Sequence, residues 1–288
     1  MGLALILGEQ RGRAAWWLAA PTLLLYVVTF LVPLGIMAVF SLSKFDGAVT
    51  SFGFHLDNYA DALTDDLTRA VFWKTVRLAL WITLACLALG YPVAVHMRRS
   101  GRTARILLIS LIVSPLLTSL IVRNVAWMLI LGRTGIINQA LLETGLVTSP
   151  VPLMFNELGV VIAVVHVYLT FMVLPIYASL CDIDPSLEES AASLGASPLE
   201  VFWNVTFPLS LGGVIAGCTL VFILSMGIYL TPMIMGGNFV LTLPMVITDL
   251  VRNQYNWSRS SALAILLLAA IGLIAVVVAL LQRRRAMA

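Results

Sequence analysis

The stretch LGVVIAVVHVYLTFMVLPIYASL, residues 158–180, is long, apolar and free of charged side chains. A helix rises about 1.5 Å per residue, so about 20 such residues cross a hydrocarbon core of ~30 Å. Buried helices of soluble proteins seldom run this long without a polar face. The length and composition of the stretch therefore predict a transmembrane helix.

Five other stretches meet the same criterion, and composition agrees with them. Hydrophobic residues make up 60% of the chain and charged residues 11%, which lies outside the range of soluble domains. The first run is longer than the core of a signal peptide, so we expect it to remain as a helix. The sequence predicts an all-α membrane protein with spans at Trp16 to Phe40, Thr75 to Val95, Ile106 to Leu131, Leu158 to Leu180, Leu209 to Met235 and Ser261 to Leu281.

Basic residues near the span ends predict the orientation, because short loops rich in arginine and lysine stay in the cytoplasm. With six spans, every arginine cluster falls on one side, and the 41–74 loop with its five aspartates falls on the other. Both termini of this multi-pass protein are therefore expected in the cytoplasm. The net charge of +3 reflects this arrangement and indicates no nucleic-acid partner. The clusters are Arg11 and Arg13; Arg98, Arg99, Arg102 and Arg105; and Arg283, Arg284 and Arg285.

The 182–208 loop, between the fourth and fifth spans, is the longest loop on the predicted cytoplasmic face. Asp184 precedes Pro185, which places an N-cap residue before a proline at the first helical position. Gly195 follows the next apolar positions and is expected to end that helix. The first half of the loop is therefore predicted to be a short helix.

A second short helix is predicted directly after the first. Ser197 and Glu200 have the spacing of a capping box, and Pro208 is expected to stop the helix before the fifth span. The pattern leaves two interpretations open. The two helices either close the loop by packing on their own ends or present a partly apolar face to a partner protein.

The loop resembles the EAA motif of ABC importer permeases. Glu189 is followed by two small residues, three others and Gly195, and residues 205–208 give the hydrophobic-x-hydrophobic-proline ending. Ser190 stands where alanine is usual and Phe207 where leucine is usual, and both keep size or apolarity. In that family the loop is a coupling helix that docks on the ATPase subunit. The resemblance implies ATPase-coupling roles for Glu188, Glu189, Ser190, Ala191, Leu194, Gly195, Ala196, Phe202 and Pro208.

The resemblance covers nearly the whole chain. Residues 58–59, 89–94, 119–127, 135–138 and 171–175 look like the spermidine/putrescine-type permease group. It implies the type I ABC importer permease fold in a bacterial inner membrane, with a cytoplasmic N-terminus 1–15, a permease domain 16–282 and a basic tail 283–288. It also implies three kinds of protein partner: a second homologous permease, two copies of an ABC ATPase and an extracytoplasmic solute-binding protein.

Motifs for chemistry are absent from the sequence. No phosphate loop occurs, so ATP and Mg²⁺ are expected on the partner ATPase and no cofactor on this chain. Neither a His-Glu-x-x-His zinc pair nor a Gly-x-Ser-x-Gly elbow occurs, and the three cysteines lack metal-ligand spacing, so we expect neither an enzyme nor a metal site. An ion-coupled carrier or stand-alone channel remains the alternative class, although it would be expected to carry acidic residues in its spans.

Polar residues inside the spans are the candidates for the substrate path, because polar groups in hydrocarbon usually face a bundle interior or a watery path. Arg123 either lines the path or bonds loop carbonyls near the outer surface. Polar residues and Pro232 interrupt the fifth span and predict a kink there. Asp249 is expected in the outer segment after that span. The pathway candidates are Arg123, Asn124, Trp127, Tyr168, Ser225, Tyr229, Thr231 and Asp249.

The cargo implied by the resemblance is a polyamine. Ammonium groups are held by aromatic faces and carboxylates, and the candidates offer several aromatic rings but one acid. Other small cargoes therefore remain alternatives: an amino-acid-like or opine-like compound, another small organic ion, or a metal.

Overall fold

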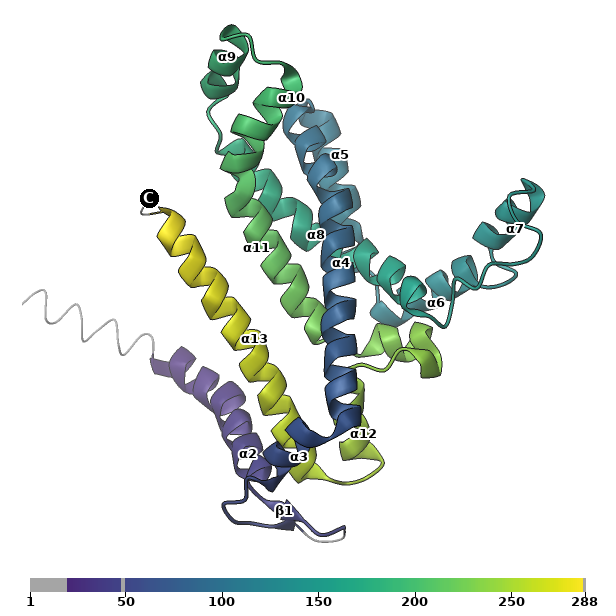
Figure 1. Cartoon of the computed structure of the whole chain (residues 1–288), viewed down its shortest axis with the longest axis vertical. Coiled ribbons are helices and arrows are strands. Elements are labelled where there is room, and N and C mark those ends of the chain that lie inside the picture. Colours follow the sequence, from purple (N-terminus) through teal and green to yellow (C-terminus); the bar gives the residue numbers. More distant parts are fainter. Residues whose placement is uncertain (1–19, 48–49, 287–288) are drawn as a thin grey trace, which may run out of the picture. The chain divides into compact units, whose positions relative to one another are not determined.

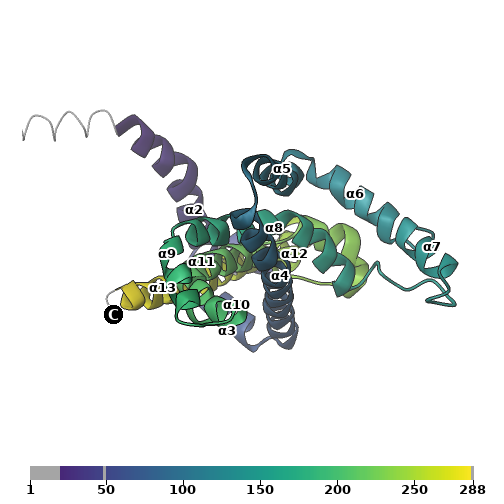
Figure 2. The same ribbon diagram turned by 90° about the horizontal axis from the view of Figure 1, so that it is seen from above.

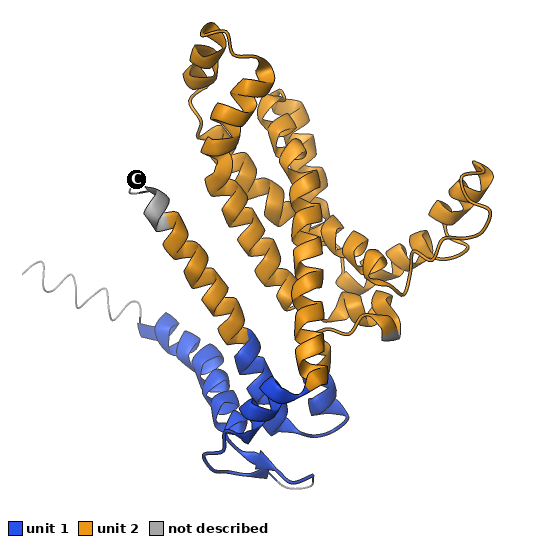
Figure 3. Cartoon of the chain, in the orientation of Figure 1, with its two compact units in different colours: residues 1–65, 247–267 blue, residues 66–246, 268–288 orange. Residues whose placement is uncertain are grey.

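The computed structural model describes residues 20–47 and 50–286, which are mostly helical (Figure 1). The predicted N-terminus 1–15 with Arg11 and Arg13, the start of the first span at Trp16, and the last two residues of the tail lie outside the described residues. The chain divides into two compact units (Figure 3). Unit 1 is residues 1–65 with 247–267, and unit 2 is residues 66–246 with 268–288.

The helices follow one another with short connections. Unit 1 contains the helix Ala20–Ser41, made of a π-helical turn η1 (Val27–Leu31) and α2 (Val32–Ser41) after its first residues, then the antiparallel strands β1 (Lys44–Phe45) and β2 (Thr50–Ser51), and α3 (Asp57–Thr64). The later elements are α4 (Asp66–Arg99), α5 (Arg102–Val113), η2 (Ser114–Leu117), α6 (Leu120–Leu131), α7 (Ile136–Glu143), α8 (Glu157–Cys181), α9 (Pro185–Ser193), α10 (Pro198–Val201), η3 (Phe202–Thr206), α11 (Phe207–Met226), η4 (Pro232–Gly236), η5 (Gly237–Phe239), α12 (Leu243–Arg252) and α13 (Trp257–Ala286).

The predicted number of spans is confirmed for the described residues. Six helical stretches are long and apolar enough to cross a membrane: Ala20–Ser41, Asp66–Arg99, Leu120–Glu143, Glu157–Cys181, Pro198–Met226 and Trp257–Gln282. The fifth predicted span is broken after α11, as expected from its polar residues.

The third predicted span, Ile106 to Leu131, is wrong as a single helix. Pro115 lies in the 3₁₀ turn η2, and Thr118 is extended between η2 and α6. A proline has no N–H, so Pro115 cannot donate to the carbonyl of Leu111. The Ser114 hydroxyl donates to that carbonyl oxygen instead, at 2.9 Å. α5 and α6 are therefore two half-length helices separated by a break.

The core of unit 2 lies where α4, α8 and α11 pack side by side (Figures 1 and 2). Ile82, Met172 and Val221 are completely buried there, one from each helix. Gly213 and Gly217 lie one turn apart on α11, and a Cβ at Gly213 would meet the backbone of α8. Small residues at this spacing let two membrane helices approach closely.

The prediction that Pro208 stops a helix is also wrong. α10, η3 and α11 form one helical stretch, Pro198–Met226. The π-helical turn η3 ends just before the proline, and the Phe207 amide donates to the Phe202 carbonyl five residues back. A π-turn shifts the hydrogen-bond register, so the missing N–H of Pro208 does not end the helix.

Asn58 and Tyr59 hold the end of the first span in unit 1. Asn58 Nδ2 donates to the carbonyls of Ser41 and Ser43 at 3.0 and 2.7 Å, and the Tyr59 hydroxyl donates to Ser41 Oγ at 2.7 Å. Ser43 Oγ shares a hydrogen bond of 2.7 Å with Ser258 Oγ of α13. These side chains satisfy carbonyls that a helix end leaves unpaired.

Candidate functional site

Side-chain caps begin both helices of the 182–208 loop, as predicted. The Asp184 carboxylate accepts from the Ser186 amide at 2.9 Å. Ser197 and Glu200 form the capping box, with N–H to oxygen distances of 3.4 Å to Ser197 Oγ and 2.7 Å to Glu200 Oε2. The backbone hydrogen bonds lower the pKa of both carboxyls, Asp184 through Ser186 and Glu200 through Ser197. Both groups therefore stay ionised at helix N-termini, where negative charge is favourable.

Gly195 ends α9, as predicted, with a positive φ of 90°. Its amide donates to the Ala192 carbonyl at 3.0 Å, and the Ala196 amide donates to the Ala191 carbonyl at 3.2 Å. These two bonds are the Schellman pattern, which reverses the chain after a helix. The turn between the two helices is thus fixed by backbone hydrogen bonds.

The outer surface of the loop carries four large apolar side chains. Leu194 is 90% exposed, Leu199 67%, Trp203 56% and Leu187 47%, and Glu189 is exposed beside them. Apolar side chains gathered on the outside of a capped loop indicate a protein-docking surface. The sequence analysis did not single out Leu199 or Trp203, because their exposure depends on how α10 packs. Of the other coupling candidates, Ser190 and Pro208 are exposed and Ala191 and Ala196 half-buried.

Glu188 and Phe202, two of the predicted coupling residues, contact other helices of this chain. The Phe202 ring packs edge-on against Tyr91 of α4, with ring centroids 5.8 Å apart. The Glu188 carboxylate accepts hydrogen bonds of 2.7 Å from Arg98 of α4 and from Thr206 of η3. The sequence analysis used Arg98 only as a topology signal and did not select Thr206.

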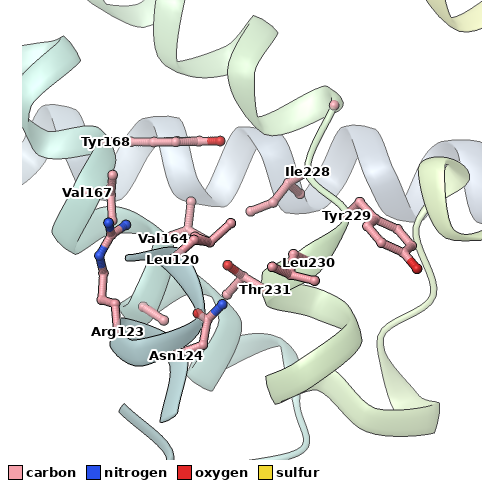
Figure 4. Close-up of a pocket in the computed structure, with 12 residues that line it drawn as sticks. Leu120, Arg123, Asn124, Val164, Val167, Tyr168, Ile228, Tyr229, Leu230 and Thr231 are labelled. Atoms are coloured by element: carbon pink, nitrogen blue, oxygen red, sulfur yellow. The ribbon is translucent and has the colours of Figure 1, made fainter. Parts of the chain in front are cut away.

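A pocket of about 300 Å³ lies in unit 2 between α6, α8 and the stretch after α11 (Figure 4). It brings together five of the predicted pathway residues, and its other lining residues are apolar or glycine. Both helix breaks, before α6 and after α11, border it. Non-helical backbone at membrane depth is tolerated where it lines a cavity. The five residues are Arg123, Asn124, Tyr168, Tyr229 and Thr231.

Arg123 binds the backbone of the helix break as well as lining the pocket. Its Nη2 donates to the carbonyls of Pro115 and Thr118 at 2.6 and 2.8 Å, and its Nε donates to Thr118 Oγ1 at 3.2 Å. The Thr118 hydroxyl also donates to the Pro115 carbonyl, at 2.8 Å. The interpretation of Arg123 as a residue that bonds loop carbonyls is therefore confirmed.

Asn124 is the pocket residue with an unused donor. It is 2% exposed, and its Nδ2 has no hydrogen-bond partner among the described residues. An unsatisfied buried donor costs about 1–3 kcal/mol. A solute or water oxygen in the pocket would remove that cost.

Two other pathway candidates lie outside the pocket lining. Trp127 Nε1 donates to His166 Nδ1 at 3.3 Å, and Ser225 is buried with its hydroxyl bonded to its own helix. The Tyr168 hydroxyl, inside the lining, donates to the Leu224 carbonyl at 3.3 Å, near the end of α11. The side chain of α8 thus satisfies a carbonyl close to the second helix break.

Asp249, the last pathway candidate, belongs to unit 1 and lies on α12, between the fifth and sixth spans. Its carboxylate accepts hydrogen bonds from Asn253 Nδ2 at 2.6 Å and Gln254 Nε2 at 2.9 Å. These bonds lower the pKa of Asp249. The carboxyl is therefore ionised, and its oxygens are used within its own helix end.

We expect Arg123→Lys to destabilise the protein almost as much as Arg123→Ala. A lysine keeps the charge but lacks the planar fork that reaches the Pro115 carbonyl and both oxygens of Thr118. The expected loss is on the order of 2 kcal/mol of unfolding free energy, measured by thermal denaturation of the purified protein in detergent. Arg133→Ala, at an exposed position of the next turn, is the control. Full stability of Arg123→Lys would show that only the charge matters.

Comparisons with known proteins agree over the length of the chain. The family described as "Binding-protein-dependent transport system inner membrane component" matches residues 1–287. The chain is 36% identical over 253 residues to the spermidine/putrescine transport system permease protein PotB of Escherichia coli, covering 88% of this chain and 92% of that protein. The PotB protein of Haemophilus influenzae is 33% identical over 230 residues, 80% of each chain. One solved structure, a bacterial alginate ABC transporter in complex with alginate pentasaccharide-bound periplasmic protein, covers 96% of both chains with a TM-score of 0.77 and 14% identity.

Proposed function

Because the chain belongs to the family of binding-protein-dependent transport system inner membrane components, we propose that it forms half of the solute path of an ATP-driven importer. It is a multi-pass inner membrane permease subunit and not an enzyme. A separate ATPase subunit binds ATP and Mg²⁺. Residues 16–282 form the permease domain, and the segments 1–15 and 283–288 lie in the cytoplasm.

The assembly has four other protein subunits. A second, homologous permease completes the path, two copies of an ABC ATPase bind the cytoplasmic face, and a solute-binding protein delivers cargo on the opposite face. The family description supports the dependence on a binding protein. The pocket supports the need for a second permease, because its open lining comes from one side of a path only.

The observation that carries the proposal is the 182–208 loop. It is capped at both helix starts, presents Leu194 and Glu189 outward, and continues without a break into α11. Its outer surface docks on the ATPase. ATP binding draws the two ATPases together, the loop passes that movement to α8 and α11, and the path opens outward. Hydrolysis then resets the path toward the cytoplasm.

The cargo is a polyamine, delivered by the binding protein. The likeness to spermidine/putrescine permeases over most of the chain supports this assignment. Tyr168 and Tyr229 give the pocket two aromatic rings, which attract ammonium groups. The carboxylates that a polyamine also needs would come from the second permease.

One feature of the pocket favours a second class of cargo. Its described lining contains the cation Arg123 and the free donor of Asn124, but no carboxylate. Such a lining suits a solute with oxygen acceptors, for example an amino-acid-like or opine-like compound. This alternative keeps the importer mechanism and changes only the solute.

Calorimetry on the cognate binding protein separates the two cargoes, because that protein selects the solute before the permease receives it. We expect spermidine or putrescine to bind with a Kd of about 1 μM, which corresponds to roughly 8 kcal/mol. A carboxylate-bearing solute of similar size is the comparison. Tight binding of that solute with no polyamine binding would replace the polyamine assignment.

A further inference from the structure

Three segments of unit 2 meet at the carboxylate of Glu188. Arg98 comes from the last turn of α4, Glu188 from α9 in the 182–208 loop, and Thr206 from η3 at the start of the fifth span. Glu188 Oε1 accepts from Arg98 Nη1 and from Thr206 Oγ1, both at 2.7 Å. Arg98 Nη2 also reaches the Ile183 carbonyl, at 3.4 Å, so the arginine contacts the loop at two points.

The contact is shielded from solvent. The side chains of Arg98 and Glu188 are 17% and 26% exposed, and Thr206 is 3% exposed. Burial alone would raise the pKa of Glu188, but the hydrogen bonds from Thr206 and Arg98 outweigh it and lower that pKa. Glu188 is therefore ionised. An ion pair this shielded is more strongly coupled than an exposed surface pair.

The neighbouring Glu189 is arranged differently. It is exposed, and no hydrogen bond from its side chain is found within the described part of the chain. Successive helix positions point about 100° apart, so one glutamate of the pair turns inward and the other outward. The two glutamates therefore have different tasks in a loop that docks on a partner.

An aromatic cluster lies next to the contact on the same helices. Tyr91 of α4 packs on Phe202 and Phe207, with ring centroids 5.8 and 5.7 Å apart, and its hydroxyl shares a hydrogen bond of 2.9 Å with Ser210 Oγ. Tyr91 lies two turns before Arg98 on α4. The start of the fifth span is thus held to α4 by two adjacent sets of contacts.

We propose that Arg98, Glu188 and Thr206 form a clasp that ties the 182–208 loop to α4, so that movement of the loop reaches the second span as well as α8 and α11. The proposal rests on the proposed function, because it assumes that an ATPase moves the loop. Arg98 is a positioning residue, since it acts through Glu188. The clasp makes α4, α8 and α11 move as one group when the ATPases close.

The test measures cargo uptake and ATP hydrolysis in the same proteoliposomes, reconstituted from the complete importer. Arg98→Ala and Glu188→Ala are expected to lower the number of solutes taken up per ATP by about tenfold, within the roughly 2- to 150-fold range of energies between contacting residues. ATP hydrolysis should persist, because the docking surface is unchanged. The exchange Arg98→Glu with Glu188→Arg should restore the ratio to within about threefold of the wild type, since the pair is re-formed.

Two further variants keep the test decisive. Arg99→Ala removes the same charge one residue away, at an exposed position, and should keep the wild-type ratio. Thr206→Val removes only a hydroxyl and should lower the ratio about threefold, in line with the loss of one hydrogen bond to a charged group. An unchanged ratio in Thr206→Val, or equal ratios in Arg98→Ala and Arg99→Ala, would overturn the clasp. Absence of ATP-driven uptake by the wild-type complex would instead overturn the proposed function.

Discussion

Gly195→Val is expected to abolish most ATP-driven uptake while leaving membrane insertion intact. Gly195 has a φ of 90°, a conformation that β-branched residues avoid, and a Cβ there would meet nothing within 4 Å. The effect therefore comes from the backbone alone, at a cost of about 1–2 kcal/mol or more. The loop would relax its turn and turn Leu194 and Glu189 away from their docking positions. We expect at least a tenfold loss of uptake, because 1.4 kcal/mol corresponds to about a factor of ten.

Gly101→Ala is the matched control for that experiment. Gly101 also has open space around its Cβ position, but its φ is −63°, which any residue adopts. The variant should insert and transport like the wild type. Normal uptake by Gly195→Val would show that the turn after α9 has no part in coupling.

Gly213→Ala is expected to destabilise the folded protein strongly for so small a change. The added Cβ would lie 2.5 Å from the Pro175 carbonyl oxygen, 2.6 Å from Ser179 Cβ and 2.9 Å from Ile176 Cα. Two of these atoms are backbone, so α8 and α11 must separate to accept the methyl group. Overpacking costs about 1–3 kcal/mol per substitution, and a backbone clash belongs at the upper end. Thermal denaturation in detergent measures the loss.

The neighbouring glycine provides the control. A Cβ at Gly212 would have Ser179 Oγ as its nearest neighbour, at 4.0 Å. Gly212→Ala should therefore match or slightly exceed wild-type stability, because alanine is the better helix former. Equal stability of Gly213→Ala and Gly212→Ala would contradict the close packing of α8 against α11.

Local features of the fold were predictable from sequence. The caps at Asp184 and Ser197 and the turn at Gly195 need only neighbouring residues, and the structure confirms all three. The number of spans followed from apolar length. The likeness to a solved importer structure also confirms the predicted permease fold.

Features that depend on other helices were not predictable in the same way. Hydropathy averages over a window, so it passed over Pro115 and merged α5 with α6 into one span. Pro208 stands where a helix usually ends, but the π-turn η3 absorbs its missing N–H. The opposite directions of Glu188 and Glu189 appear only when α4 supplies Arg98. Sequence spacing shows which residues share a helix face and not which neighbour that face meets.

ATP-dependent solute uptake by proteoliposomes is the most direct test of the central claim that this chain is the permease subunit of an ATP-driven importer. The vesicles would contain this chain, its partner permease and the ATPase, with the binding protein and its labelled solute outside. The account predicts uptake that requires both hydrolysable ATP inside the vesicles and the binding protein, and that disappears when this chain is omitted. Uptake driven by an ion gradient, without ATP or the ATPase, would contradict it and indicate an ion-coupled carrier.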